Sequence, residues 1–367
     1  MSAPPAAILP LNGALKIADL FCGCGGLTLG AREAARSTQR ELKIQFAVDH
    51  FGSALAVYRA NFGVDEKTAV AADITDLLPG EPESPISAQE QKLVDDLGSI
   101  DIVLAGPPCQ GHSDLNNLSR RDDERNKLYL KVVRFVEIVL PKVVVIENVP
   151  TVVHDRNDVV GSTKTIFSKL GYHVKETIVS FLDLGVPQHR KRHILLAKQD
   201  SDTDFPESFS AEVANGISIR DYIADLADDC DRYDDVFRTA SRMSPKNKKR
   251  TQHLFEHDLF DLPNELRPKC HRDGNHSYKS MYGRLHIDKP AQTITTGFGS
   301  MGQGRYVHPT RPRVITPHEA ARIQGFPDFF SFDSVKYRGH LQEMIGNAVP
   351  PQLTAQLVAH MLEIGEL

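Results

Sequence analysis

The 367-residue sequence predicts an α/β fold, with a parallel sheet covered by helices on both faces and a second, smaller domain. Two observations support this. Through the first two hundred residues, apolar runs rich in β-branched side chains alternate with segments of helical periodicity, which is typical of parallel strands joined by crossover helices. After about residue 200 the alternation stops, and 201–290 is rich in Asp, Asn, Pro, Arg and His.

The strands and helices of the first domain follow in order along the chain. Six apolar runs are expected as strands: 15–21, 44–50, 101–107, 142–149, 173–182 and 192–199. Three segments have helical character, namely 27–37, 53–62 and 126–140. The last of these puts Tyr129, Val132, Val133, Val136 and Val139 on one stripe. A further amphipathic helix begins after a proline in 350–365, and we expect it to pack back on the first domain.

Composition narrows the class of protein. The apolar fraction of 41% and the charged fraction of 25% are those of a soluble globular protein. Five cysteines without framework spacing indicate a reducing, intracellular setting. The N-terminal sequence has no evident export signal, and no apolar run approaches the roughly 18 residues of a membrane span. We therefore expect a cytoplasmic protein that does not associate with membranes.

Charge is unevenly distributed along the chain. The net charge is −5, yet 236–313 holds 15 Lys and Arg against 6 Asp and Glu, together with 6 of the 15 histidines. A basic stretch of this length is either a solvated surface or a surface that binds a polyanion. Because it covers most of the predicted second domain, polyanion binding is the better interpretation.

A glycine-rich turn follows the first predicted strand in DLFCGCGGLTLG. Glycines between a strand and a helix allow close approach of a ligand and leave the helix N-terminus open. Asp49 ends the second strand, where a carboxylate can accept hydrogen bonds from ribose hydroxyls. The pattern predicts an adenosine-containing cofactor. The spacing is not G-x-G-x-x-G, so NAD is the alternative, and Cys22 and Cys24 are interpreted as small packing residues.

Polar residues at later strand ends suggest a reactive centre. Cys109 follows DIVLAGPP, a predicted strand that ends in a rigid turn, so its sulfur is expected at the carboxyl edge of the sheet; the alternative is a buried structural cysteine. Glu147 ends VVVIE near the same edge and is either a buried acid that binds a heterocycle or a helix cap. Arg190 and Arg192 suit carbonyl or phosphate oxygens, or a surface ion pair. Asp73 is expected either near an adenine amino group of a cofactor or as the N-cap of a helix.

Seven motifs in order resemble those of bacterial-type DNA (cytosine-5) methyltransferases. They are DLFxGxGG, GPPCQ, ENV, QxRxR and the segments 288–298, 305–328 and 345–351. Only about 200–275 is unmatched. The resemblance implies a Rossmann-like sheet of the kind found in S-adenosylmethionine-dependent methyltransferases. This sheet would belong to a cofactor-binding and catalytic domain of 1–200 plus 340–367. The segment 201–339 would then be a target-recognition domain.

The resemblance also implies a mechanism. Members of the family flip a cytosine out of the duplex, because C6 cannot be reached in a stacked pair. Cys109 would attack C6, and C5 would then take the methyl group from S-adenosylmethionine, leaving S-adenosylhomocysteine. Glu147 would bind and protonate the ring at N3, and Arg192 would contact the base carbonyl. Arg190 and Gln188 would support that geometry.

The expected binding residues follow from the same motifs. The cofactor would be surrounded by Asp19, Phe21, Gly23, Gly25, Gly26, Asp49, His50, Asp73, Ile74, Pro107 and Asn347. DNA contacts are expected from Gln110, Ser113, Arg120, Arg121, Gln188, Lys246, Lys248, Lys249 and Arg250. Ser113, Arg120 and Arg121 belong to 111–127, which matches the family's mobile loop; the alternative is an ordinary surface loop. Two positions depart from the family pattern, since His50 and His112 stand where aromatic residues are common.

The expected partner is double-stranded DNA, which places the protein near the nucleoid. We expect a monomer without a metal ion. A partner endonuclease in a restriction-modification or defence system is left open, as is the recognised sequence. Two other interpretations remain at this point: a cytosine-5 methyltransferase of RNA such as tRNA, and a nucleic-acid-binding relative without activity.

Overall fold

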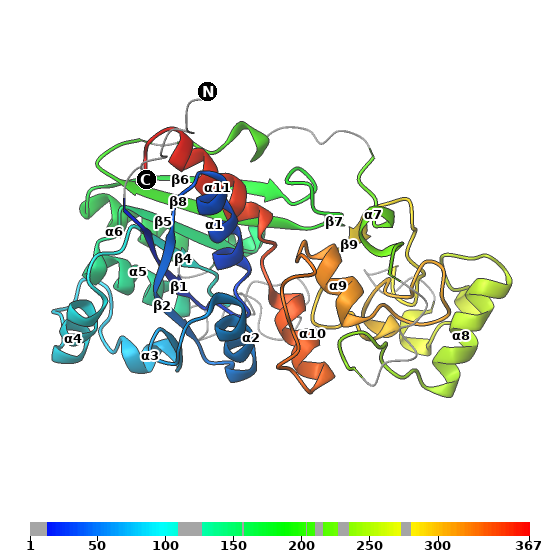
Figure 1. Cartoon of the computed structure of the whole chain (residues 1–367). Coiled ribbons are helices and arrows are strands. Elements are labelled where there is room, and N and C mark those ends of the chain that lie inside the picture. Colours follow the sequence, from blue (N-terminus) through cyan, green and yellow to red (C-terminus); the bar gives the residue numbers. More distant parts are fainter. Residues whose placement is uncertain are drawn as a thin grey trace, which may run out of the picture.

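The computed structural model describes residues 13–108, 127–155, 158–202, 204–209, 216–226, 235–272 and 280–367. Its largest element is a seven-stranded sheet in the order β3-β2-β1-β4-β5-β8-β6, at the left of Figure 1. The strands are β1 (Leu15–Leu20), β2 (Leu42–Asp49), β3 (Ala69–Ala71), β4 (Ile102–Ala105), β5 (Val143–Asn148), β6 (Tyr172–Ser180) and β8 (Lys191–Gln199). The predicted α/β class is confirmed.

The sheet is not parallel throughout, which corrects the prediction. From β3 to β5 all neighbours are parallel, but β8 is antiparallel to both β5 and β6. The connection from β6 to β8 is only 181–190, whereas a parallel crossover needs roughly a dozen residues or more. The chain therefore turns back, and β8 lies between β5 and β6.

Helices cover both faces of the sheet. One face carries α3 (Ile74–Leu77), α4 (Ala88–Leu97), α5 (Lys127–Val139) and α6 (Val159–Lys169). The stripe predicted for α5 faces the core, since Tyr129, Val132, Val133 and Val136 are buried there. The opposite face carries α1 (Gly26–Ser37) and α11 (Gln352–Glu363).

The C-terminal helix packs directly on the first helix. Leu27 and Ala31 of α1 share one apolar core with Leu353 and Leu357 of α11, and Figure 1 shows the two helices side by side. The approach is close, because a Cβ at Gly26 would lie 2.1 Å from the carbonyl oxygen of Val349. The segment before α11 therefore requires a glycine at the start of α1.

The remaining elements form a smaller part at the right of Figure 1, in which short helices are joined by long irregular segments. It contains α7 (Arg220–Ile223), α8 (Pro245–Glu256), β9 (Ala291–Gln292) and α9 (Pro317–Ile323), while β9 pairs with β7 (Gln188–His189). Short 3-10 turns are η2 (Pro150–His154), η3 (Glu207–Phe209), η5 (Asn264–Leu266), η6 (Lys269–His271) and η7 (Met301–Gln303). Phe298, Phe326 and Phe332 pack here against α2 (Gly52–Phe62) and α10 (Arg338–Asn347).

A buried charge cluster holds the start of α9 in place. Glu319 has no exposed surface, and its two carboxylate oxygens accept hydrogen bonds from the Arg313 guanidinium at 2.7 and 2.8 Å. The His308 ring lies 3.2 Å from the same carboxylate, and the backbone N–H of Thr316 donates to it at 2.8 Å. Burial raises the pKa of Glu319, but the Arg313 guanidinium and the nearby His308 ring outweigh it and hold the pKa well below its usual range.

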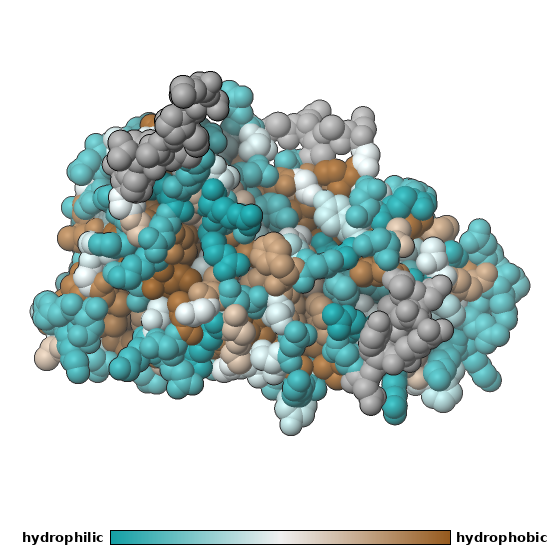
Figure 2. All heavy atoms as spheres, viewed as in Figure 1, coloured by the Kyte–Doolittle hydropathy of each residue, from teal (hydrophilic) through white to brown (hydrophobic). Residues whose placement is uncertain are grey.

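In the described part of the chain, no helix has both the length and the apolar character needed to cross a membrane. Figure 2 shows hydrophilic residues over the end of the smaller part that carries α8.

Candidate active site and cofactor cradle

The glycine turn after β1 is built on residues with left-handed backbone conformations. Phe21, Gly23 and Gly25 have positive φ values of 58°, 53° and 98°, and they alternate with residues of ordinary φ. Hydrogen bonds within the protein hold the turn in this shape, since the N–H of Cys22 donates to the carbonyl oxygen of Val48 and the N–H of Gly25 to that of Cys22. Asp49 at the end of β2 orders the turn, because its carboxylate accepts hydrogen bonds from the N–H of Gly23 at 2.9 Å and of Phe51 at 2.8 Å.

Asp19 supplies a buried carboxylate beside this turn. Its side chain has no exposed surface, Oδ2 accepts a hydrogen bond from the Thr28 hydroxyl at 2.6 Å, and Oδ1 has no hydrogen-bond partner. Burial, with a smaller contribution from the charge of Asp49, raises the pKa of Asp19 to about 7. An unpartnered buried acceptor beside an open glycine turn fits a ligand with a cationic group, as S-adenosylmethionine has.

Cys22 and Cys24, in the same turn, are buried. Burial is the main reason that the pKa of the Cys22 thiol is well above its usual range and that of Cys24 is about 12. Both thiols are therefore held in the protonated, unreactive form, in keeping with a packing role.

The other expected cofactor residues lie at the carboxyl ends of β2 to β5 or on helices beside them. The His50 side chain is 78% exposed and lies 3.4 Å from the Asp49 carboxylate. Asp73 is the N-cap of α3 and accepts hydrogen bonds from the Thr75 backbone and hydroxyl, which lower its pKa. Three further residues lie at this edge, namely Ile74, which is buried, Pro107 after β4, and Asn347 at the end of α10.

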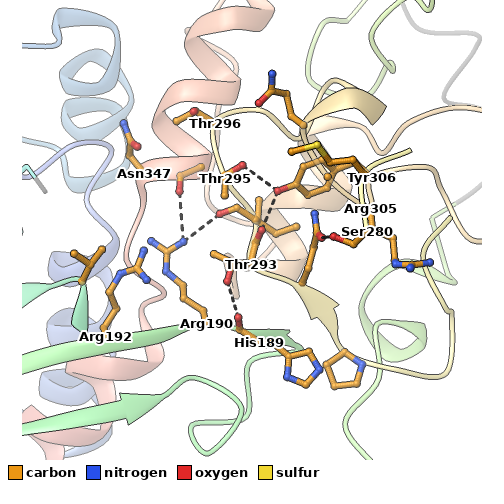
Figure 3. Close-up of a pocket in the computed structure, with 18 of the residues that line it drawn as sticks. His189, Arg190, Arg192, Ser280, Thr293, Thr295, Thr296, Arg305, Tyr306 and Asn347 are labelled. Atoms are coloured by element: carbon orange, nitrogen blue, oxygen red, sulfur yellow. Dashed lines mark hydrogen bonds between the residues drawn. The ribbon is translucent and has the colours of Figure 1, made fainter. Parts of the chain in front are cut away.

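A cavity of about 1210 Å³ opens between the edge of the sheet and the smaller part. Arg192, Arg190 and Asn347 line it from one side. The other side is polar and comes from the segments around β9, with Ser280, Thr293, Thr295, Thr296, Arg305 and Tyr306. Figure 3 shows these side chains facing the cavity from different elements.

Glu147 and Arg192 form an ion pair near this cavity. Glu147 is 6% exposed, and its Oε1 lies 2.7 Å from Nε of Arg192. The pairing of Ala105 with Ile146 puts Gly106 beside Glu147, where a Cβ at Gly106 would be 3.7 Å from Oε2. The described residues break off after Pro108 and resume at 127, so the contact lies next to the start of this gap. Cys109, Gln110, His112, Ser113, Arg120 and Arg121 lie outside the described residues.

Arg190 and Gln188 are both buried between the two parts of the molecule. Arg190 donates hydrogen bonds to the carbonyl oxygens of Ile294 at 3.2 Å and Gly346 at 3.5 Å. Gln188 donates to Gln324 at 2.6 Å, and its side-chain oxygen accepts from the N–H of Ile294 at 3.1 Å. Gln188 was expected to contact DNA, and in the structure its side-chain amide is buried and hydrogen-bonded within the protein.

The four basic residues expected to contact DNA lie on α8. Lys246, Lys248 and Lys249 are exposed on this helix. Arg250 is half-buried and donates hydrogen bonds to the carbonyl oxygen of Leu266 and the side chain of Asn247, both at 2.8 Å. Its guanidinium is therefore engaged within the protein, and the three lysines are the accessible charges.

Sequence reasoning gave no role to the polar wall around β9. The Tyr306 hydroxyl lies 3.0 Å from the Thr295 hydroxyl and donates to the carbonyl oxygen of Thr293 at 2.9 Å, and Thr293 in turn donates to the carbonyl oxygen of His189 (Figure 3). The signal was present in QTITTG, a run of hydroxyl side chains that follows Pro290. The pairing of β7 with β9 brings this run to the cavity beside Arg190 and Arg192.

Comparisons with known proteins give a consistent result. The family model "C-5 cytosine-specific DNA methylase" matches residues 15–363. The chain is 45% identical to the type II methyltransferase M1.BsuMI of Bacillus subtilis over 95% of its own length and 80% of the relative's. It is 31% identical to the type II methylase M.HgiDII of Herpetosiphon aurantiacus over 92% of each chain.

Solved structures show the same fold at low sequence identity. The S. pombe Dnmt2 methyltransferase superposes with a TM-score of 0.67 at 18% identity, covering 96% of this chain and 100% of its own. The Entamoeba histolytica methyltransferase EhMeth superposes with a TM-score of 0.64 at 17% identity, covering 96% and 99%.

Proposed function

The chain belongs to the C-5 cytosine-specific DNA methylase family and transfers a methyl group from S-adenosylmethionine to C5 of cytosine in DNA; from this premise we propose how its own residues act. Cys109 is the nucleophile that bonds to C6 of a cytosine flipped out of double-stranded DNA. Glu147 holds a proton at N3 of the ring, and Arg192 binds the base carbonyl. The observation that carries this assignment is the Glu147–Arg192 pair beside the end of β4, where the chain leads into Cys109.

The proposed cofactor site is the glycine turn with Asp19, Phe21, Gly23, Gly25, Gly26, Asp49, His50, Asp73, Ile74, Pro107 and Asn347. The bound cofactor supplies the electrophilic methyl group. Asp49 accepts hydrogen bonds from the ribose, and the turn keeps the amino-acid end close to β1. Arg190 and Gln188 act by positioning, since they link the strand that carries Arg192 to the wall of the cavity.

The substrate assignment is tested by expressing the chain in a methylation-free bacterial strain. Bisulfite sequencing of the host DNA is expected to show one short sequence methylated at cytosine throughout. The same purified protein, with labelled S-adenosylmethionine, is expected to label duplex DNA and not tRNA. Label in tRNA alone would favour the RNA methyltransferase, and label in neither would favour a binding protein without activity. The 45% identical type II relative favours the DNA enzyme over both alternatives.

Asp49→Ala is expected to weaken binding of S-adenosylhomocysteine by roughly ten- to hundredfold, because a hydrogen bond to a charged group contributes about 1.5–3 kcal/mol. Isothermal titration calorimetry measures the change. Asp49→Asn is the matched control, since its side-chain oxygen can still accept the Phe51 or Gly23 N–H and it should lose less affinity. Unchanged affinity in the alanine variant would place the ribose partner elsewhere.

The second domain, 201–339, is proposed to recognise the target sequence, with Lys246, Lys248 and Lys249 contacting phosphates. Changing these three lysines to glutamine is expected to weaken binding to all DNA sequences alike. The slope of log affinity against log salt should fall by about 0.9 for each phosphate that the variant no longer neutralises. Changing Lys164 and Lys169 on α6 is the control. An unchanged slope in the triple variant would mean that α8 does not contact DNA.

We propose that the chain acts as a monomer in the cytoplasm, at the nucleoid, and that it protects host DNA beside a partner endonuclease. Type II relatives support this setting. Sedimentation of the protein with and without duplex DNA tests the oligomeric state. Challenge of host DNA with lysates of the source cells tests for an endonuclease that is blocked by the methylation.

A further inference from the structure

We propose that Thr28 and Tyr58 position the Asp19 carboxylate toward the ammonium group of the cofactor, and that Asp19 gives up a proton when the cofactor binds. The inference rests on the proposed cofactor site at the glycine turn. It adds two positioning residues from α1 and α2, and a proton that is released on binding.

The geometry is a chain of three side chains that ends in the buried carboxylate. The Thr28 hydroxyl lies 2.6 Å from Oδ2 of Asp19 and 2.9 Å from the Tyr58 hydroxyl, and all three side chains are buried. A hydroxyl has only one proton to donate. When Asp19 is ionised, Thr28 must donate to it, so Tyr58 must donate to Thr28. Oδ2 is thus fixed from inside the protein, and Oδ1 remains without a partner.

Tyr58 also shapes the turn itself. A Cβ at Gly25 would lie 2.8 Å from the Tyr58 ring and 2.4 Å from the ring of Phe62, so the rings of α2 are packed directly under the turn. The same ring therefore sets both the position of the glycine turn and the hydrogen bond that reaches Asp19. A shift of Tyr58 would therefore change both the glycine turn and the hydrogen bond that reaches Asp19 through Thr28.

The charges around Asp19 come from three directions. Asp49 on β2 and the two thiols of Cys22 and Cys24 in the turn are the acidic groups that face it. Tyr58 stays neutral, because burial raises its pKa well above the usual range. Arg32 of α1 is the nearby cation, and it interacts with Tyr58 and the Phe62 ring. Among these described groups, a positive partner for Oδ1 is missing.

The proton balance follows from this arrangement. With a pKa of about 7, Asp19 is partly protonated at neutral pH in the free protein. An ammonium group beside Oδ1 favours the carboxylate, so the carboxylic acid proton leaves to the buffer as the ion pair forms. Because the free protein binds this proton more tightly than the complex, affinity is expected to rise with pH through about 7 and then level off.

The test is calorimetry of S-adenosylhomocysteine binding at pH 6, 7 and 8 in two buffers of different ionisation enthalpy. The wild-type protein is expected to release a fraction of a proton that is largest below pH 7 and small at pH 8. Thr28→Val removes the donor to Asp19 at nearly constant shape. It is expected to lower affinity at pH 7 roughly tenfold, as for a lost hydrogen bond to a charged group, and to move the pH midpoint upward.

Thr28→Ser is the matched control, because it keeps the hydroxyl; it should bind within a few-fold of wild type with the same midpoint. If Thr28→Val does not fold, Tyr58→Phe should shift the midpoint in the same direction by a smaller amount. The inference is overturned if wild type releases no proton between pH 6 and 8, or if the valine and serine variants share one midpoint. Failure of the cofactor site itself is recognised separately, by unchanged affinity in Asp49→Ala.

Discussion

Replacing Cys109 by alanine is expected to abolish methyl transfer and to leave cofactor binding nearly intact. In the proposed mechanism its thiolate forms the covalent bond that makes C5 nucleophilic, and loss of a nucleophile costs up to roughly 10⁶ in rate. Cofactor binding should survive because the glycine turn and Asp49 belong to different strands from the segment that leads into Cys109. Single-turnover methylation of duplex DNA and calorimetry with S-adenosylhomocysteine measure the two effects.

The control for this prediction is Cys270→Ala, because Cys270 is an exposed free thiol in the smaller part. It should methylate DNA at the wild-type rate. Duplex DNA with 5-fluorocytosine at the target should trap the wild-type protein in a denaturant-stable adduct, since C5 cannot lose fluorine as it loses a proton. Wild-type activity in Cys109→Ala, or an adduct formed equally well by that variant, would refute the mechanism.

The largest effect on stability is expected from Glu319→Gln. The change removes the negative charge from a carboxylate that pairs with Arg313 and contacts His308, all in a buried setting. Breaking a buried pair by removing one partner costs about 3–5 kcal/mol, since the other charge is left uncompensated. Denaturant unfolding followed by fluorescence of the tyrosines measures the loss, and DNA affinity should fall with it because α9 packs in the core of the smaller part.

Asp328→Asn is the matched acid-to-amide control. Asp328 pairs with Arg322 at the surface, where a pair contributes about 0–1 kcal/mol.

The effect of Glu319→Gln should also depend on pH. Because the pKa of Glu319 is lowered in the fold, its contribution is fully present above the usual glutamate range and is lost as pH falls. A difference in stability that stays constant into strong acid would assign the effect to packing instead.

The sequence predicted the parts of the fold that depend on local pattern. Apolar runs located six of the seven strands of the large sheet, and the α5 stripe was correct. The antiparallel direction of β8 was missed because the apolar pattern of a buried strand does not depend on whether the strand is parallel or antiparallel to its neighbours. Only the short connection 181–190 determines the direction. The three-residue strand β3 is too short for a pattern to show.

The site residues were predictable where the chemistry needs one residue type at a strand end. They were less predictable where burial determines whether a polar side chain faces a ligand or the protein interior. Asp19, Asp49 and Glu147 lie at the expected edge of the sheet. Gln188 and Arg250 were expected at DNA, yet their hydrogen bonds are within the protein. A polar side chain in a sequence does not reveal whether its partner is water, DNA or a carbonyl oxygen from a segment one hundred residues away.

The packing of α11 on α1 has a consequence for synthesis of the chain. On the ribosome, α1 is made early, but α11, which covers its apolar face, emerges only after 201–339, the proposed recognition domain, has been translated. Until then the apolar face of α1 with Leu27 and Ala31 lacks the side chains of α11 that cover it, and Gly26 lacks its close contact with the backbone of Val349. The proposed cofactor site is therefore expected to lack this packing partner until the segment proposed to select the DNA sequence has been made. A nascent chain is expected to remain inactive until it carries its own specificity.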